Sequence, residues 1–462
     1  MKKNKTNNFD VVISGSGLNG TILAVALATQ LENNNLIKNI AIVENNPQNY
    51  LNFADKNKNV PIDHRCYALS PASVAFLEKL GVWQNIDEKE ICIGENMEIF
   101  GDANGYLKFA AAEQNKKFLC HFVEADVLKR EMAATIKHNH KIQVLCPKKI
   151  NNFSWKNDDS LTINLDDNEE IHTKLLVAAE GKYSQIREMS GLSWTKKDYQ
   201  EQALLWRVKA EHFHRNTAFQ WFYLHSTFAF LPMPNNELYV IWFSKFPERF
   251  DAEYYLKNPQ ELAKKAEELS QNILGKMTLC PEIEPIMFPI ELWRANEIIA
   301  PRLAIIGDSA HGIHPLTGQG LNLGIADIRA MTKVFSAAKE NDDIGDLTLL
   351  KQFARKAKAE TIVSQCLTDF THDVFQPQFS LSAASQSASI FVKEIFPFLQ
   401  PLDVPEKLQK LEQHPAFNAF INPVLQKSLP FLRNSLLSVV NKIPPVKNIL
   451  MQNAQGIFFG NN

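Results

Sequence analysis

The sequence predicts an α/β protein in which a Rossmann-like nucleotide-binding sheet is interrupted by an antiparallel β-sheet and followed by helices. Three observations carry this prediction. Near the start, an apolar run, a glycine-rich turn, a helical pattern and a second apolar run follow one another. Two more short apolar runs far along the chain each end at an acidic residue beside a glycine. Between those two runs, residues 200 to 288 are rich in alternating aromatic residues.

Size and composition limit the class of protein. The 462 residues are enough for two or three domains. Because 49 Lys and Arg nearly balance 51 Asp and Glu, no nucleic-acid partner is expected. The six cysteines form no Cys-x-x-Cys pair, so we expect reduced, mostly buried thiols. No apolar run reaches about 18 residues, so no transmembrane helix and a cytoplasmic location are expected.

The first unit has the pattern of a βαβ element. Residues 9–14 predict a strand, residues 21–31 a helix, and residues 40–43 a second strand that ends at Glu44. The turn between the first strand and the helix reads Gly15-Ser16-Gly17-Leu18-Asn19-Gly20. In such a turn, Gly15 permits a tight bend, Gly17 lets a pyrophosphate approach, and Gly20 lets the helix pack on the strand. Glu44 is placed to accept from ribose hydroxyls, so dinucleotide binding is favoured over a purely structural turn.

A second glycine-punctuated segment lies at residues 307–327. It follows the apolar run 303–306, which we expect to join the first strand and the run 175–179 in one sheet. Asp308 offers a carboxylate for a sugar-like chain, and the loop offers backbone N–H groups for an anionic ring edge. This combination suits a flavin better than a nicotinamide. From residue 326 to about 374 the pattern is helical.

The same segment resembles the Gly-Asp motif of FAD-dependent aromatic hydroxylases. Its form, from His314-Pro315 through Gly318-Gln319-Gly320 to Asn322, is similar to the ubiquinone-biosynthesis branch of that family. Asp63 to Ser70 resembles the Asp-x-Arg-x-x-Ala-Leu-Ser signature of that branch. The resemblance covers nearly the whole chain, with further matching segments at residues 230–233, 288–290, 368–370, 431–434 and 454–456.

The resemblance implies a fold like that of p-hydroxybenzoate hydroxylase, with FAD as cofactor and NAD(P)H as co-substrate. The implied activity is hydroxylation, with O2, of the aromatic ring of a polyprenyl phenol intermediate in ubiquinone biosynthesis. No catalytic acid or base is assigned, and no metal is expected, because His311 and His314 lack a third ligand. The predicted cofactor-binding residues are Gly15, Gly17, Gly20, Glu44, Arg65, Asp308, Gly320, Leu321 and Asn322. The candidates for the loop that faces the flavin are His314, Pro315, Gly318 and Gln319.

The expected domains follow the same pattern. Residues 1–195 and 285–335 form a discontinuous FAD-binding domain, from which part of 80–120 joins the substrate domain. Residues 196–284 form the β-sheet substrate domain. Residues 336–462 form a C-terminal helical region with an insertion at 377–429.

Two alternatives stay open, and departures from the family pattern motivate the second of them. Glu180 stands where the family has Asp, and Ala125 stands where it has Asn. The first alternative is a hydroxylase of a soluble aromatic compound. The other alternative is a non-catalytic flavin- or lipid-binding subunit of a quinone-biosynthesis assembly.

The C-terminal segment has a charge pattern that is independent of the family. From Gln413 onward it contains no acidic residue, while Lys427, Arg433, Lys442 and Lys447 are interleaved with apolar residues. Such a segment can lie on an anionic membrane surface, which would make the protein peripheral on the inner membrane. An ordinary docked pair of terminal helices is weighed equally.

Overall fold

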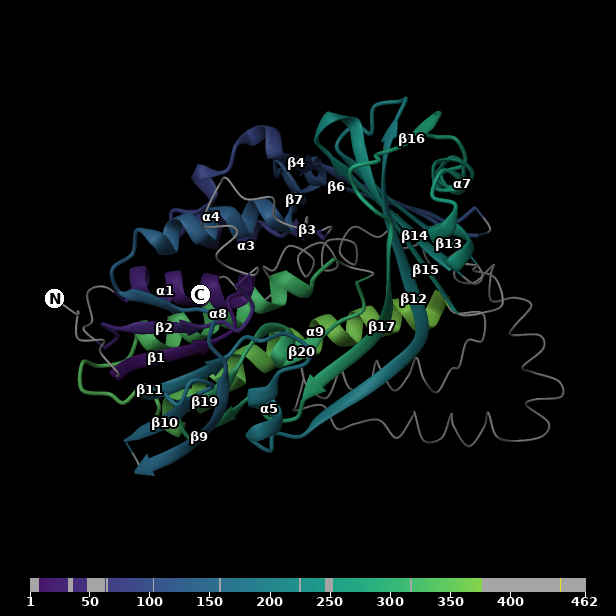
Figure 1. Ribbon diagram of the computed structural model, residues 1–462. Helices are drawn as coiled ribbons and strands as arrows, with labels where there is room; N and C mark the ends of the chain where they lie inside the picture. Colours follow the sequence, from purple (N-terminus) through teal and green to yellow (C-terminus); the bar gives the residue numbers. More distant parts are fainter. Residues whose placement is uncertain are drawn as a thin grey trace, which may run out of the picture.

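The computed structural model describes residues 8–31, 36–47, 63, 65–102, 104–157, 159–223, 226–245, 252–315, 318–375 and 441. The expected insertion at 377–429 and nearly all of the basic C-terminal segment lie outside these residues. Figure 1 shows two large sheets beside each other, one around β1, β2 and β11 and the other around β12, β14 and β15. No helix within the described ranges is long and apolar enough to span a membrane.

The first large sheet is the predicted nucleotide-binding sheet. Its main path runs β18-β19-β11-β1-β2-β8, and β10 and β9 extend antiparallel from β11. The pairs β19–β11, β11–β1, β1–β2 and β2–β8 are parallel. In β1, Val11, Val12 and Ile13 are fully buried, as expected for a central parallel strand covered on both faces. The strands are β1 (Asn8–Ser14), β2 (Ile40–Val43), β8 (Ile142–Leu145), β9 (Ile150–Asn157), β10 (Ser160–Leu165), β11 (Glu170–Ala178), β18 (Ile299–Ala300) and β19 (Leu303–Ile305).

Helices pack around this sheet. α1 contacts α4 and α8, and α8 contacts α9. Two predicted helix starts were too late: α1 begins at Leu18 rather than residue 21, and α8 begins at Gly320 rather than after residue 326. In both cases one glycine that suggested a loop, Gly20 or Gly320, lies inside the first turn of the helix. The helices are α1 (Leu18–Gln30), α3 (Pro71–Lys79), α4 (Ala125–Lys137), α5 (Gln185–Met189), α8 (Gly320–Ser336) and α9 (Leu347–Phe375).

The second large sheet is antiparallel, as the alternating aromatic pattern predicted, apart from one parallel pair between β13 and β5. Its path runs β20-β17-β12-β15-β14-β13-β5-β6, with β16 beside β12. Its strands are β5 (Asn96–Phe100), β6 (Tyr106–Ala110), β12 (Trp194–Ala210), β13 (Thr217–Tyr223), β14 (Ser226–Met233), β15 (Glu237–Lys245), β16 (Met277–Leu279), β17 (Ile286–Ala295) and β20 (His311–Gly312).

Two helices interrupt the segment that the sequence assigned to strands alone. They are α6 (Ala252–Lys257) and α7 (Glu261–Leu269). α7 buries Leu262, Ala266 and Leu269, whose spacing is that of one helix face. It covers one face of the second sheet through a core that includes Trp206 and Trp242.

A small third sheet lies between the two large ones. It has the order β3-β7-β4, from β3 (Cys66–Leu69), β7 (Cys120–Glu124) and β4 (Ile91–Gly94). Both β4 and β7 contact β14 of the second large sheet. β3 contacts α8, so this sheet connects the nucleotide-binding part to the antiparallel part.

Candidate functional site

The three glycines of the turn between β1 and α1 have different neighbours. Gly15 has a φ of +103°, and a Cβ there would lie 2.6 Å from the carbonyl oxygen of Ala179. A Cβ on Gly20 would overlap the carbonyl oxygen of Gly15. Apart from Gly17 and its two chain neighbours, no atom of the described residues would lie within 4 Å of a Cβ on Gly17. The fold therefore requires Gly15 and Gly20, whereas the space beside Gly17 is open to a ligand.

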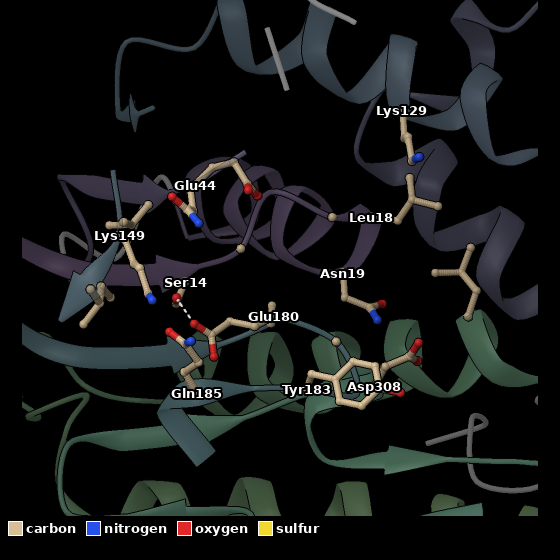
Figure 2. Close-up of a pocket in the computed structure, with 18 of the residues that line it drawn as sticks. Ser14, Leu18, Asn19, Glu44, Lys129, Lys149, Glu180, Tyr183, Gln185 and Asp308 are labelled. Atoms are coloured by element: carbon tan, nitrogen blue, oxygen red, sulfur yellow. Dashed lines mark hydrogen bonds between the residues drawn. The ribbon is translucent and has the colours of Figure 1, made fainter. Parts of the chain in front are cut away.

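That open space belongs to a cavity of about 550 Å³ at the carboxyl ends of the parallel strands. In Figure 2, Glu44 and Lys149 lie at one end of the drawn residues and Asp308 and Tyr183 at the other. Gly20 and Asn322 do not line it. The predicted cofactor-binding residues that line it are Gly15, Gly17, Glu44, Arg65, Asp308, Gly320 and Leu321.

Glu44 is held at the edge of the glycine turn. It follows β2 and is only 7% exposed. Its Oε2 accepts from the N–H and the hydroxyl of Ser16, both at 2.8 Å, and its Oε1 accepts from the N–H of Asn46 at 2.7 Å. These bonds fix the position of the carboxylate at the edge of the cavity.

The carboxylate of Asp308 lines the other end of the cavity. Its side chain accepts no hydrogen bond from the described residues, although its main-chain oxygen accepts from Trp293 Nε1 at 2.9 Å. Burial raises the pKa of Asp308, and the opposing fields of His311 and Arg65 do not cancel the effect. Nearby, the Oδ1 of Asn19 is buried with no donor in the described structure. A polar ligand in the cavity would satisfy the Asp308 carboxylate, whereas the Asn19 oxygen lies against Gly324.

The turn that carries Asp308 is held from behind by a buried pair. Asp327 Oδ2 accepts from the N–H of Gly307 at 2.9 Å and lies 2.8 Å from His311 Nε2. Burial alone would lower the pKa of His311, but the Asp327 carboxylate raises it above its usual value. His311 therefore acts in the support of the loop. No group of three or more His, Cys, Asp or Glu within the described ranges is arranged to hold a metal ion.

Arg65 lines the cavity and forms a bidentate ion pair with Asp63. Its Nε lies 2.8 Å from Asp63 Oδ1, and its Nη2 lies 2.6 Å from Asp63 Oδ2. Burial alone would raise the pKa of Asp63, but Arg65 and Lys129 hold it well below its usual value. The guanidinium is thus oriented before any ligand arrives.

A second cavity of about 570 Å³ adjoins the first and is mainly apolar. Its floor is the face of the second large sheet, with Leu205, Ile241 and Phe288. Its walls come from β3, β7 and the loop before α8. The residues that line both cavities are Arg65, Tyr67, Gly320 and Leu321.

Asn322 joins the two signature segments of the sequence. Its Oδ1 accepts from the N–H of Ser70 at 2.9 Å and from the hydroxyl of Ser73 at 2.7 Å. Its Nδ2 donates to the carbonyl of Ala68 at 2.8 Å. The side chain therefore ties the start of α8 to β3 and α3, and Asn322 lines the apolar cavity.

The four candidates for a flavin-facing loop separate into two groups. Pro315, Gly318 and Gln319 line the apolar cavity. His314 lines neither cavity and is fully buried, with its Nε2 3.1 Å from Glu201 Oε2 and its ring packed edge-on against Tyr199. The His314 side chain therefore packs against β12 of the second large sheet.

Glu180 has contacts that its place in the sequence did not reveal. One carboxylate oxygen accepts from Ser14 Oγ at 2.6 Å, and the other accepts from Ser184 Oγ at 2.7 Å and from the N–H of Ile186 at 3.0 Å. The longer side chain therefore links the end of β1 to the start of α5 while still lining the cavity, as Figure 2 shows. Sequence reasoning also missed Asn19, which stands at a variable position of the glycine turn, and Gln220, for which the sequence gives no motif.

Comparisons with known proteins agree with this geometry. A family model described as an FAD binding domain matches residues 8–363. The chain is 27% identical over 367 residues to 3-demethoxyubiquinol 3-hydroxylase of Escherichia coli, covering 79% of this chain and 90% of the relative. It is 27% identical over 376 residues to ubiquinone hydroxylase UbiL of Rhodospirillum rubrum, covering 79% and 82%.

The fold also matches solved structures. One is p-nitrophenol 4-monooxygenase PnpA from Pseudomonas putida, with a TM-score of 0.63, 14% identity, and coverage of 98% of this chain and 100% of that one. The predicted fold class is thereby confirmed: a nucleotide-binding sheet with an inserted antiparallel sheet and following helices.

Proposed function

Because the chain belongs to the family defined by this FAD-binding domain, we propose that it is an FAD-dependent monooxygenase of ubiquinone biosynthesis. It uses NAD(P)H and O2 to hydroxylate the aromatic ring of a polyprenyl phenol intermediate. The observation that carries the proposal is the apolar cavity that meets the nucleotide cavity at Gly320 and Leu321. The names of the relatives support the same substrate class.

The residues of the first cavity fit FAD. In this proposal the pyrophosphate lies beside Gly17, a ribose bonds Glu44, and the sugar-alcohol chain bonds Asp308. The main-chain N–H groups of Gly320 and Leu321, at the start of α8, would hold the anionic edge of the flavin ring. The open space at Gly17 and the unpartnered carboxylate of Asp308 support this assignment.

Bound FAD, with NAD(P)H and O2, supplies the oxidation–reduction chemistry. The side chains have other tasks. The apolar side chains of the second cavity, among them Leu205, Ile241 and Phe288, exclude water. Exclusion of water prevents side reactions that would consume NAD(P)H without hydroxylating the substrate. Pro315 and Gln319 form part of the wall of the second cavity and would hold the aromatic ring in place.

The charge of the second cavity favours a prenylated phenol over a soluble aromatic acid. Among the described residues that line it, Arg65 is the only charged one, and Asp63 already pairs with it. A buried carboxylate ligand would have no other cation there, and leaving it unpaired is costly. A neutral, apolar aromatic ligand meets no such cost.

The purified protein tests this proposal directly. It should be yellow, and NAD(P)H oxidation should rise when a polyprenyl phenol is added. With isotopically labelled O2, mass spectrometry should find one labelled oxygen atom in the product. A prenyl-free aromatic acid that turns over equally well would favour the soluble-substrate alternative. Bound FAD without NAD(P)H oxidation with any phenol would favour a non-catalytic subunit.

We also propose that the basic C-terminal segment places the enzyme on the inner-membrane surface, within reach of an apolar substrate or a quinone-biosynthesis assembly. The support is the sequence alone, in which four cations and no acids follow Gln413. Flotation with anionic liposomes should carry the full chain at low salt and lose it at high salt. Absence of binding at low salt would remove this proposal.

A further inference from the structure

One row of side chains crosses the floor of the apolar cavity on five neighbouring strands. Gln220 on β13 is paired with Ala229 on β14, and Ala229 is paired with Ile241 on β15. Ile241 is paired with Leu205 on β12, and Leu205 with Ile286 on β17. All five residues line the cavity, and Gln220 is the one polar member of the row.

The amide of Gln220 has no partner within the described structure. The side chain is 3% exposed, and its Nε2 is buried without a hydrogen-bond acceptor. A buried amide that is left unsatisfied costs free energy, so native structures normally supply a partner. Asn322, which also lines the cavity, shows the usual case, because both ends of its amide are bonded.

We propose that Gln220 binds an oxygen substituent on the aromatic ring of the substrate and thereby sets the orientation of the ring. This inference rests on the proposed function, since it assumes an aromatic ligand in this cavity. A neutral amide can donate to a hydroxyl, methoxy or carbonyl oxygen and can also accept from a hydroxyl. The aliphatic neighbours Ala229 and Ile241 offer such an oxygen no side-chain partner of their own. Gln220 is thus a specificity-determining residue for ring substitution.

A matched pair of ligands tests this role in the oxidised holoenzyme. Geranylphenol and geranylbenzene differ by the hydroxyl, and the dissociation constant of each is measured from the change in flavin absorption. The wild type should prefer geranylphenol. In Gln220→Met, which keeps the side-chain length but not the amide, this preference should fall by about three- to tenfold, the size of one neutral hydrogen bond.

Leu205→Met is the control, because it changes the same row without changing hydrogen bonding, and its preference should equal that of the wild type. Gln220→Leu repeats the measurement, so the test does not depend on the folding of one variant. An unchanged preference in a FAD-loaded Gln220 variant overturns the inference alone, provided that the wild type hydroxylates geranylphenol. If neither ligand binds to the wild type, the proposed function falls together with the inference.

Discussion

The two cavities meet at Gly320 and Leu321 but are built from different parts of the chain. The nucleotide cavity takes its key groups from turns at the ends of strands, such as Gly17 after β1 and Asp308 after β19. The apolar cavity takes most of its floor from the middle of strands in the second sheet, such as Leu205 and Ile241. Turns present main-chain groups and carboxylates to a charged ligand, whereas a sheet face presents a broad apolar surface. Substitutions should therefore separate cofactor binding from substrate binding.

The largest expected effect is that of Gly17→Val on FAD binding. The backbone of Gly17 (φ −62°, ψ 175°) suits any residue, and its Cβ would point into open space. The folded protein should therefore keep its thermal midpoint without cofactor, while FAD affinity falls by at least about tenfold, because the side chain occupies the space of the pyrophosphate. Flavin content after purification and calorimetry of the FAD-free protein measure the two effects.

Gly20→Ala is the control for this prediction. A Cβ there overlaps the carbonyl oxygen of Gly15, so it should destabilise the protein itself by about 1 to 3 kcal/mol. A fully flavinated Gly17→Val variant would mean that no pyrophosphate lies beside this residue.

A substitution in the second sheet should weaken substrate binding and leave FAD binding unchanged. Ala229→Leu adds three carbon atoms to the floor of the apolar cavity, which Ala229 lines without lining the nucleotide cavity. FAD content should stay unchanged, while the KM for a polyprenyl phenol should rise by roughly tenfold because the ligand loses space. Leu231→Met, which conserves volume in the same cavity, should change KM little. Loss of FAD in Ala229→Leu would show that the two cavities are not independent.

The same contrast explains what the sequence could predict. Gly15, Gly17 and Glu44 were predicted because the βαβ pattern fixes their geometry over a short stretch of chain, and Asp308 because it follows a strand at the start of the second glycine-punctuated segment. The apolar cavity depends on strand register: Gln220, Ala229, Ile241 and Leu205 form one row only through the successive pairings of four strands. Register cannot be derived from local spacing, because most of β13 is buried on both faces and its alternation does not mark the cavity side.

His314 shows the same limit at a single residue. It belongs to the motif that was expected to face the flavin, yet its ring lies against Glu201 and Tyr199. Glu201 is 113 residues away in the sequence. A histidine beside a glycine-rich loop gives no local signal of such a distant partner. The structure therefore supplies the side-chain directions that the motif alone could not.

The smallest expected effect is that of Asp308→Asn on the melting temperature of the FAD-free protein. This substitution should stabilise the FAD-free protein but weaken FAD binding. Burial raises the pKa of Asp308, whereas in the unfolded chain it stays near its usual value of about 3.9. The folded state therefore binds the proton more tightly, and stability is lost as the pH rises from the usual pKa through the raised one. Asp308→Asn cannot ionise, so its FAD-free form should melt about 1 to 4 °C higher at neutral pH. The gain should shrink towards about pH 4, where Asp308 is protonated.

The same variant should bind FAD more weakly, by about 1.5 to 3 kcal/mol, because a charge-assisted hydrogen bond is lost. Asp327→Asn is the control, since that carboxylate supports Gly307 and His311, and its loss should lower the melting temperature at either pH. A pH-independent gain for Asp308→Asn would mean that ionisation of Asp308 is not its source. A gain that follows the titration, together with weaker FAD binding, would mean that the nucleotide cavity keeps a destabilising carboxylate because the cofactor requires it.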